Sequence, residues 1–140
     1  MEVKIKRLHP NAVIPRYAKN GDAGMDLTAT SAHRDDDGNI VYGTGISIEI
    51  PQGYVGFLFQ RSSNSKTNLT LTNSTGVIDS GYRGEISMKF KELAYEMKRY
   101  YIGDRIGQLI IMPYPQIEFK EVDELSKSER GDAGYGSTGR

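Results

Sequence analysis

Asp79 is the clearest candidate for a reacting group in this sequence. It follows the apolar residues Val77 and Ile78 and precedes the pair Ser80-Gly81. The β-branched residues predict a buried strand end, and the pair predicts a turn, because glycine accepts a positive φ. A carboxylate at such a strand end is partly desolvated and aimed, as a general base must be. The alternative is an aspartate that only closes an Asx-turn with its own backbone.

A second group of polar residues interrupts the apolar stretch from Tyr54 to Phe59, which is predicted to be a strand. Arg61, Ser62 and Ser63 follow it directly. Serines after a strand are good helix caps, so a short helix is predicted to begin here. Free N–H groups at a helix start, two hydroxyls and a guanidinium together make a phosphate cradle. A plain helix cap beside a surface arginine is the alternative.

Asp26 and Gln108 are polar residues inside otherwise apolar segments. Asp26 stands between Met25 and Leu27, so in an extended segment its side chain faces opposite to theirs. Taken by itself, it is interpreted as a structural hydrogen-bond acceptor. Gln108 is the one polar interruption of a strand that is predicted to be buried, so either backbone or a ligand must satisfy its amide.

The last eleven residues, 130–140, cannot pack a core. They contain four glycines, two arginines, a serine, a threonine and a single tyrosine. The default interpretation is a disordered terminus. Glycine-rich backbone with hydroxyls and arginine also wraps a polyphosphate, and one aromatic ring could lie on a base.

The rest of the chain is predicted to be all-β, with one short helix and many turns. Alternating apolar residues mark strands around Ile46–Ile50 and around Ile86–Phe90, the latter forming a hairpin with the strand before Asp79. Arg34–Asn39 is predicted to be a solvated hairpin tip. The segment 91–100 also has helical spacing, but it is interpreted as a strand end, a loop and a new strand starting at Tyr100.

Composition excludes several functions. The 140 residues are expected to form one domain at 1–120, followed by a linker and a glycine-rich arm at 121–140. Zero formal net charge predicts no sequence-independent binding to nucleic acid or to an anionic membrane. The absence of cysteine and the presence of only two histidines exclude thiolate and histidine-rich metal sites. No apolar run approaches ~20 residues and no secretory signal begins the chain, so a cytoplasmic protein is expected.

Five separated segments resemble, in order, the five motifs of the trimeric deoxyuridine triphosphatases (dUTPases). They are Ala23–Leu27 (AGMDL), Arg61–Ser63 (RSS), Gly76–Glu85 (GVIDSGYRGE), Gly103–Gln108 (GDRIGQ) and Arg130–Gly139 (RGDAGYGSTG). The resemblance implies a jelly-roll-like β-barrel or sandwich that assembles as a homotrimer with three shared active sites. The first, second and fourth motifs would come from one subunit and the third from its neighbour. The arm of the third subunit would close over the nucleotide.

The activity implied by the resemblance is hydrolysis of dUTP to dUMP and pyrophosphate. Asp79 would orient a water for in-line attack on the α-phosphorus, and Tyr82 would pack against the deoxyribose. This reaction limits uracil incorporation into DNA and supplies dUMP for dTMP synthesis. The uracil edge would be read by Asn73 and by the backbone of Gly76, Val77 and Ile78.

The resemblance also implies how the phosphates are held. Mg²⁺ would be bound by the triphosphate, and Asp26 would contact the waters of the ion. Tyr135 would cover the base, with Gly136 beside it in the arm. The phosphates would be bound by Arg61, Ser62, Ser63, Gln108, Arg130, Ser137 and Thr138.

Two departures from the family pattern and two alternative functions complete the sequence-based prediction. Gln60 stands where relatives usually carry glycine or proline, and Tyr135 stands where phenylalanine is usual. A related dCTP deaminase or a bifunctional relative shares the fold, but the intact arm favours the pyrophosphatase. A nucleotide-sensing, protein-binding module on the same fold is the other alternative, and a further protein partner is left open.

Overall fold

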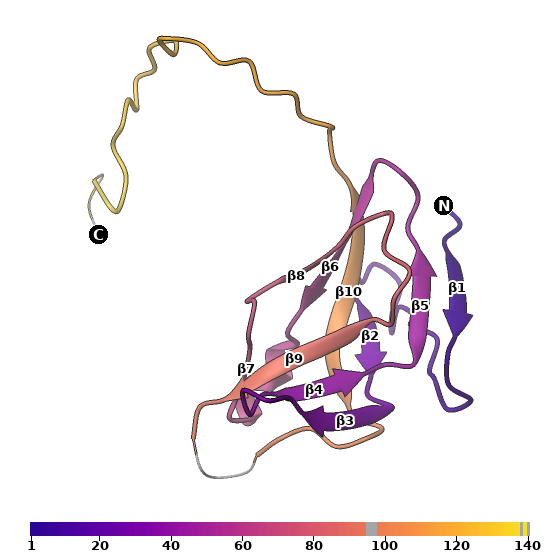
Figure 1. The fold of residues 1–140 in the computed structure, drawn as a ribbon. Helices are drawn as coiled ribbons and strands as arrows, with labels where there is room; N and C mark the ends of the chain where they lie inside the picture. The colour runs from indigo at the N-terminus through magenta and orange to yellow at the C-terminus, as the bar shows by residue number, and fades with distance from the viewer. Residues whose placement is uncertain (95–97, 138, 140) are drawn as a thin grey trace.

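The chain folds into antiparallel β-structure with one short helix. The computed structural model describes residues 1–94, 98–137 and 139 (Figure 1). In chain order the elements are β1 (Lys4–Arg7), β2 (Met25–Thr28), β3 (Ser31–Arg34), β4 (Ile40–Gly43), β5 (Ile46–Glu49), β6 (Tyr54–Phe59), the 3₁₀-helix η1 (Ser62–Lys66), β7 (Leu69–Leu71), β8 (Gly76–Ile78), β9 (Ser87–Glu92) and β10 (Arg105–Pro113).

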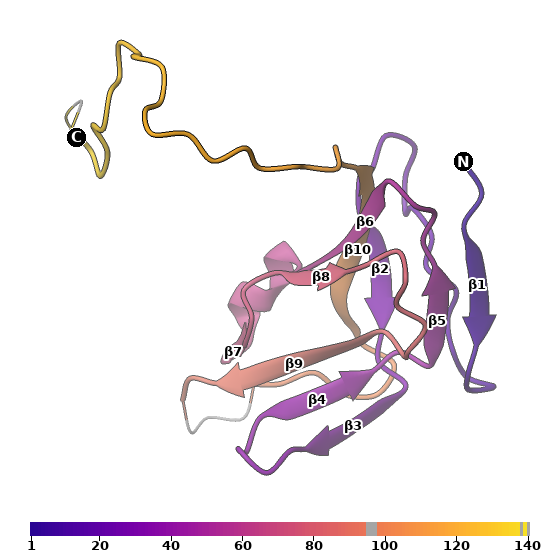
Figure 2. The ribbon, with the colours of Figure 1, turned by 45° about the horizontal axis from the view of Figure 1, so that its top comes forward.

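Two four-stranded sheets enclose the core (Figure 2). One has the strand order β2-β10-β6-β8, the other has the order β3-β4-β9-β7, and β1 pairs separately with β5. Strands of both sheets contribute buried apolar side chains: Leu27, Leu58 and Leu109 from the first, and Tyr42, Met88 and Phe90 from the second. The all-β, sandwich-like fold predicted from the sequence is therefore confirmed.

The strands on either side of Asp79 are not paired with each other, so the predicted hairpin is wrong. β8 pairs with β6, whereas β9 pairs with β4 and β7. The connection 79–85 therefore passes from one sheet to the other. Alternation of apolar residues indicates which face of a strand is buried. Strands of both sheets bury their apolar face against the same core, so their patterns look alike. The pattern cannot reveal the partner strand.

The hairpin predicted around Arg34–Asn39 is confirmed. Arg34 of β3 lies opposite Ile40 of β4, and the turn between them is closed by Asp35. The Asp35 amide donates to the Asn39 carbonyl at 3.0 Å, and Asp35 Oδ1 accepts from the Asn39 amide at 2.9 Å.

Tyr100 does not begin a strand, contrary to the prediction. β9 ends at Glu92 and the next strand, β10, starts at Arg105. Tyr100 is buried because its ring packs edge-on against the rings of Tyr42 and Phe90, with centroids 6.1 and 5.7 Å apart. Aromatic residues are favoured both in strands and in cores. Here the tyrosine at position 100 serves core packing and not a strand. The alternative prediction for 91–100 is a helix, and residues 95–97 of that segment lie outside the described residues.

The helix predicted after β6 is present as the 3₁₀-helix η1. Its N-cap is Arg61, and no side chain caps it. The predicted capping by serine is therefore wrong, although Ser62 and Ser63 do open the helix.

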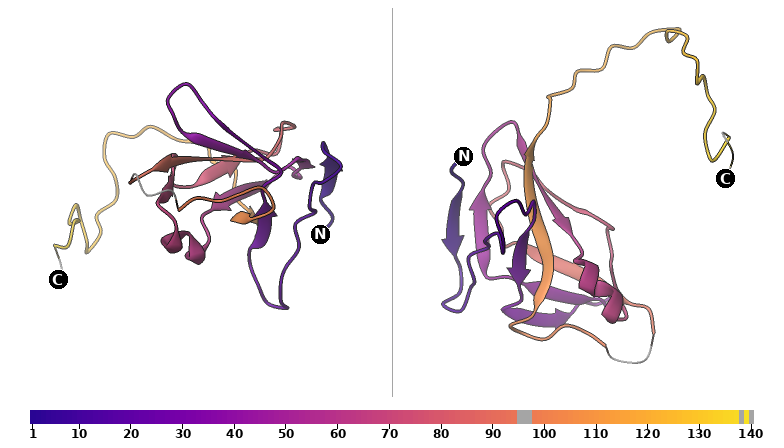
Figure 3. Two further views of the ribbon diagram at one scale, coloured as in Figure 1. Left: turned by 90° about the horizontal axis from the view of Figure 1, so that it is seen from below. Right: turned by 180° about the vertical axis from the view of Figure 1, so that it is seen from behind.

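The residues after β10 leave the body as an extended arm (Figures 1 and 3). The arm starts at the end of β10 that lies away from η1 (Figure 3). Phe119 and Tyr135 are fully exposed along it. Among the described residues, no helix has the length and apolar character needed to cross a membrane.

Candidate active site

The outward face of the sheet β2-β10-β6-β8 carries the polar residues predicted from separate segments. Asp26 on β2, Gln108 on β10 and Phe59 on β6 lie opposite one another across the strands. Paired residues share a face of a sheet, and the adjacent positions Leu27 and Leu109 are buried in the core. Asp26 and Gln108 therefore point away from the core, as predicted for Asp26.

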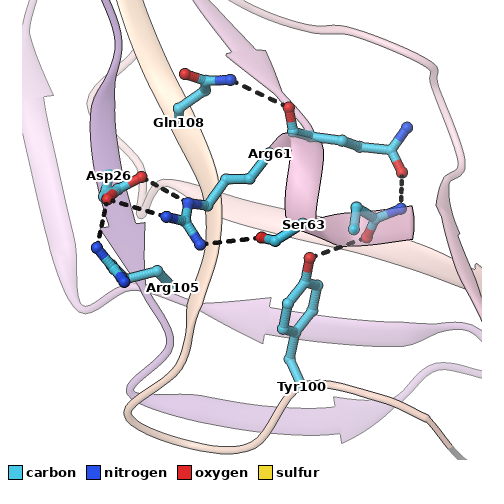
Figure 4. Close-up of polar contacts among 8 residues, drawn as sticks. Asp26, Arg61, Ser63, Tyr100, Arg105 and Gln108 are labelled. Atoms are coloured by element: carbon cyan, nitrogen blue, oxygen red, sulfur yellow. Dashed lines mark hydrogen bonds and ion pairs between the residues drawn. The ribbon is translucent and has the colours of Figure 1, made fainter. Parts of the chain in front are cut away.

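A carboxylate between two guanidinium groups is the centre of this site (Figure 4). Arg61 donates through Nε to Asp26 Oδ1 at 2.7 Å and through Nη2 to Oδ2 at 3.5 Å. Arg105 donates through Nη1 to Asp26 Oδ2 at 3.2 Å. Arg61 Nη1 also donates to Ser63 Oγ at 3.1 Å. The structural acceptor role predicted for Asp26 is thus present, because its carboxylate orients both arginines.

Gln108 is satisfied by backbone, which was one of its two predicted partners. Its Nε2 donates to the carbonyl oxygen of Gln60 at 3.2 Å. The amide packs so close to β2 that a Cβ atom on Gly24 would overlap it. Glycine at position 24 therefore permits the close approach that sets the Gln108 side chain.

Three side chains hold η1 in place, and sequence analysis assigned a site role to none of them. Asn64 Nδ2 donates to Gln60 Oε1 at 2.7 Å and to the Leu69 carbonyl at 2.8 Å. Asn64 Oδ1 accepts from Tyr100 Oη at 3.0 Å (Figure 4). Burial raises the pKa of Tyr100, so its hydroxyl stays protonated and available as a donor.

Asp26 and its two arginines line a pocket of about 380 Å³, a volume typical of small-molecule sites. Its polar lining is Asp22, Asp26, Arg61, Ser62, Arg105 and Gln108. One carboxylate oxygen of Asp22 is already used in a hydrogen bond, because Oδ2 accepts from the Lys19 amide at 2.8 Å. A hydroxyl and two arginines in one pocket are suited to bind phosphate oxygens.

A larger pocket, of about 550 Å³, lies elsewhere. It is formed by β3, β4 and the loop from Arg99 to Ile102, and its lining contains none of the predicted site residues. Volume alone therefore does not locate the site, and the chemistry of the lining residues decides between the two pockets.

Asp79 lies far from the pocket beside Asp26 within one chain. Ile78 is opposite Gly56, whereas Asp26 lies in the cross-strand row of Phe59. With about 3.3 Å per residue along a strand and about 4.8 Å between strands, Asp79 and Asp26 are about 20 Å apart. Asp79 is also exposed, so the predicted partial desolvation is absent in the single chain.

The turn after Asp79 forms without the glycine conformation that was predicted. The Asp79 carbonyl accepts from the Tyr82 amide at 3.0 Å, yet Gly81 has no positive φ. Tyr82 is half exposed, and its hydroxyl donates to the Glu85 carbonyl at 3.0 Å. Its ring is therefore held against Gly84 and Glu85, at the end of the loop that begins at Asp79.

The residues predicted to read the base lie on β8 and in the loop before it. Asn73 is exposed, and its carbonyl accepts from the Thr75 amide at 2.6 Å. Gly76 is buried and Ile78 is partly buried, but Val77 is 58% exposed, which corrects the prediction of a buried strand end. The reason is that Val77 lies opposite Phe57 on the outward face of the sheet.

The predicted arm residues that the structure describes do not contact the pocket beside Asp26 or the turn after Asp79. Arg130 donates through Nε to the Ala133 carbonyl at 3.0 Å, and the Ser137 amide donates to the Gly134 carbonyl at 3.0 Å. Tyr135 and Gly136 both have positive φ, of 51° and 81°, in a tight turn. Thr138 lies outside the described residues.

Comparison with known proteins identifies the family. A sequence model of the dUTPase family matches residues 10–139. The chain belongs to the dUTPase family. The resemblance predicted from five segments is therefore confirmed. Curated relatives named deoxyuridine 5′-triphosphate nucleotidohydrolase include one from Thermobifida fusca, 43% identical over 99% of this chain and 79% of the relative. Another, from Corynebacterium glutamicum, is 41% identical over 99% of this chain and 95% of the relative.

Solved dUTPase structures have the same fold. A variant dUTPase of Staphylococcus bacteriophage 80alpha, in complex with dUpNHpp, aligns with a TM-score of 0.82 at 30% identity and covers 99% of both chains. A variant dUTPase of phage phi11 of S. aureus, described with a structural Mg(II) ion, aligns with a TM-score of 0.75 at 29% identity. That alignment covers 89% of this chain and 98% of the other.

The side chains that the structure describes do not form a cage for a resident Mg²⁺. Within the described ranges, no three residues among His, Cys, Asp and Glu are placed together to hold an ion. The Asp26 carboxylate already accepts from two guanidinium groups. A cation bound directly by these side chains therefore does not fit.

Proposed function

We propose that this chain hydrolyses dUTP to dUMP and pyrophosphate, as a homotrimer whose active sites are shared between subunits. The family match over residues 10–139 is the observation that carries the reaction. Phosphoryl transfer needs positioning and charge neutralisation more than covalent chemistry by the protein. The reaction removes dUTP from the precursors of DNA and supplies dUMP for dTMP synthesis. A cytoplasmic location stays a prediction.

The proposed residue roles follow from where each side chain lies. Arg61, Ser62 and Gln108 line the pocket on the outward sheet face and hold phosphate oxygens. Asp79, at the other edge of the same sheet, accepts the proton of the attacking water. Tyr82, whose hydroxyl is held by the Glu85 carbonyl, packs against the deoxyribose.

The position of Asp79 supports a site shared between chains. In-line attack requires the water at Asp79 to lie about 3–3.5 Å from the α-phosphorus. In one chain Asp79 and the arginine pocket are about 20 Å apart along the sheet. A second copy must therefore bring its Asp79 to the first copy's pocket. A heterologous contact of this kind closes into a ring when the rotation fits, as in a trimer.

An apolar patch on the same outward face also supports assembly. Phe57, Phe59, Val77 and Ile110 lie on this face, and the rings of Phe57 and Phe59 are 5.9 Å apart. Val77 is 58% exposed, and Phe57, Phe59 and Ile110 are partly exposed. A contiguous exposed apolar patch commonly marks a protein–protein contact. We assign this patch to the subunit interface.

Mg²⁺ is assigned to the substrate rather than to the protein. The ion prefers phosphate oxygens and water, and it keeps several waters when bound. It therefore enters on the triphosphate, with Asp26 close enough to touch its waters. This assignment agrees with the lack of a side-chain cage among the described residues.

Pyrophosphate release tests the proposed substrate. The enzyme is incubated with Mg²⁺ and, separately, with dUTP, dCTP, dTTP or UTP. Release from dUTP at a specificity constant at least ~10²-fold above the others is expected, because a site built to pair the uracil edge leaves polar groups unpaired with cytosine. Equal specificity constants for dUTP and dCTP would overturn the proposal.

Mixing two inactive variants tests the shared site. Asp79→Asn keeps the arginine pocket, and Arg61→Ala keeps the base, so each variant alone is expected to be nearly inactive. Refolded together from denaturant at equal amounts, they are expected to recover about a quarter of the wild-type sites, if each site takes one group from each of two neighbouring subunits. Each variant refolded alone is the control. No recovery in mixtures that sediment as trimers would contradict the shared site.

A further inference from the structure

Arg105 reaches the phosphate pocket only because β10 contains a bulge. Arg105 lies opposite Thr28 on β2, whereas Gly107 lies opposite Leu27, so one extra residue is inserted at this point. In a regular strand, residues three positions apart point to opposite faces. The inserted residue places Arg105 on the same outward face as Gln108, and bulges beside active sites commonly re-aim a side chain in this way.

The two arginines at Asp26 differ in how many donors they have already used. Arg61 bonds through all three of its nitrogens, to Asp26 and to Ser63, and its side chain is 24% exposed. Arg105 bonds to Asp26 through Nη1, and its side chain is 58% exposed. A guanidinium has five N–H donors, so Arg105 has more donors left for a ligand than Arg61 has.

We propose that Arg105 is a further substrate-binding residue, which Asp26 holds beside Arg61 so that its free donors contact a phosphate oxygen of the nucleotide. This inference rests on the proposed function, in which the pocket binds the triphosphate. Asp26 is then a positioning residue for both arginines. A planar fork that bonds a carboxylate with one edge and a phosphate with the other is suited to guanidinium and not to ammonium.

Calorimetric binding of the non-hydrolysable analogue dUpNHpp with Mg²⁺ tests the proposal on the full chain. Arg105→Ala is expected to raise the Kd about tenfold or more, since it removes a charge-assisted hydrogen bond to the ligand. Arg105→Lys keeps the charge without the fork, so an intermediate Kd is expected. Binding of dUMP, which lacks the distal phosphates, is expected to change little. Equal Kd values for the wild type and both variants would overturn the inference.

Arg34 provides a matched control. It is also exposed and also pairs with one carboxylate, Glu92, at 2.8 Å, but it lies on the other sheet. Arg34→Ala is expected to leave the Kd unchanged. Thermal midpoints of all variants show whether weaker binding comes from loss of folding. If Arg105→Ala does not fold, the Kd of Arg105→Lys tests whether Arg105 binds the phosphate.

Two further variants separate this inference from the proposed function. If Arg61→Ala weakens binding and Arg105→Ala does not, Arg105 is not a ligand but the pocket stands. If neither weakens binding, the pocket itself is wrongly assigned. Asp26→Asn must turn an NH₂ group toward one of the arginines, so it is expected to weaken binding less in the Arg105→Ala background than in the wild type. Additive effects would contradict the positioning role.

Discussion

Asp79 differs from what its neighbours in the sequence predict, because it is exposed in the single chain. Its carbonyl and the ring of Tyr82 are fixed by the turn, so the position is ordered even though it is open to water. Under the proposed assembly, an adjacent subunit covers this edge of the sheet and supplies the missing desolvation. The general-base role assigned to Asp79 is then a property of the trimer.

Asp79→Asn is expected to lower kcat by ~10²-fold or more, because the amide keeps the shape of the side chain but cannot accept a proton. The Kd for dUpNHpp is expected to stay close to that of the wild type. Asp36→Asn, an exposed aspartate of the β3–β4 turn, is the control and should turn over normally. Wild-type turnover by Asp79→Asn would show that another group is the base.

The short helix η1 depends on its neighbours for its position, since a 3₁₀-turn of five residues has little stability of its own. Asn64 ties it to β7 through Leu69, to the strand end through Gln60 and to the core through Tyr100. These bonds hold the backbone from which Arg61 and Ser63 project. Gln60, a departure from the family pattern, is therefore built into the support of the site.

Asn64→Ala is expected to destabilise the fold by about 1–3 kcal/mol, because partly buried polar groups of Gln60, Leu69 and Tyr100 lose a partner. The Kd for dUpNHpp should rise as well, because η1 is less well positioned. Urea unfolding and calorimetry measure the two effects. Ser65→Ala removes a single exposed bond in the same turn, to the Ser62 carbonyl, and is expected to change neither quantity.

Asp35 in the β3–β4 turn forms a charge pair with Lys89 on β9, and the pH dependence of this pair can be measured. Lys89 bonds to Asp35 at 2.8 Å and, together with the bonds from Asn39, lowers the pKa of Asp35 from 3.8 to about 2. Since the pKa in the folded state is the lower one, the stabilisation is fully present above about pH 4 and is lost as the pH falls toward 2.

A carboxyl NMR titration of Asp35 is expected to show a midpoint near pH 2. In Lys89→Met the midpoint should return toward the ordinary value of 3.8, because the largest cause of the shift is removed. An unchanged midpoint in the variant would mean that Lys89 does not bond to Asp35 in solution.

Beyond its first residue, the described part of the extended arm makes only local hydrogen bonds near its end, such as that from Arg130 to the Ala133 carbonyl. Its glycines at 131, 136 and 139 have positive φ, and Tyr135 projects fully into solvent. Ordering such a segment costs roughly 1–2 kcal/mol per residue in backbone entropy. The triphosphate can offset this cost by charge-assisted hydrogen bonds to Arg130 and Ser137, and a base stacked on Tyr135 adds ~1–3 kcal/mol.

Deletion of residues 130–140 is expected to leave the trimer intact and to reduce turnover sharply, because water exclusion and phosphate positioning are lost. Sedimentation and pyrophosphate release measure the two quantities. Tyr135→Trp in the full chain serves as a reporter, with a fluorescence change expected on adding dUpNHpp with Mg²⁺ and little change with dUMP. Full activity of the truncated enzyme would show that the arm is only a terminus.

Most strands and the family were predictable from the amino-acid sequence alone. Alternation around Ile46 and around Met88 follows from burial of one strand face, which is a local property of the chain. The same alternation predicted that Asp26 faces away from Leu27, and it does. The five dUTPase segments carried the family and the candidate residues, because each segment keeps its residue types at fixed spacing.

Only the tertiary structure decided which strands are partners and which polar groups meet. The strands flanking Asp79 lie in different sheets, because both present an apolar face to one core and the pattern is the same for either partner. Arg105 joins Gln108 on one face through a bulge, which is a property of strand register and leaves no periodic signal. The 20 Å estimate between Asp79 and Asp26 likewise depends on strand order, about 4.8 Å for each strand crossed, and strand order is set by long-range packing.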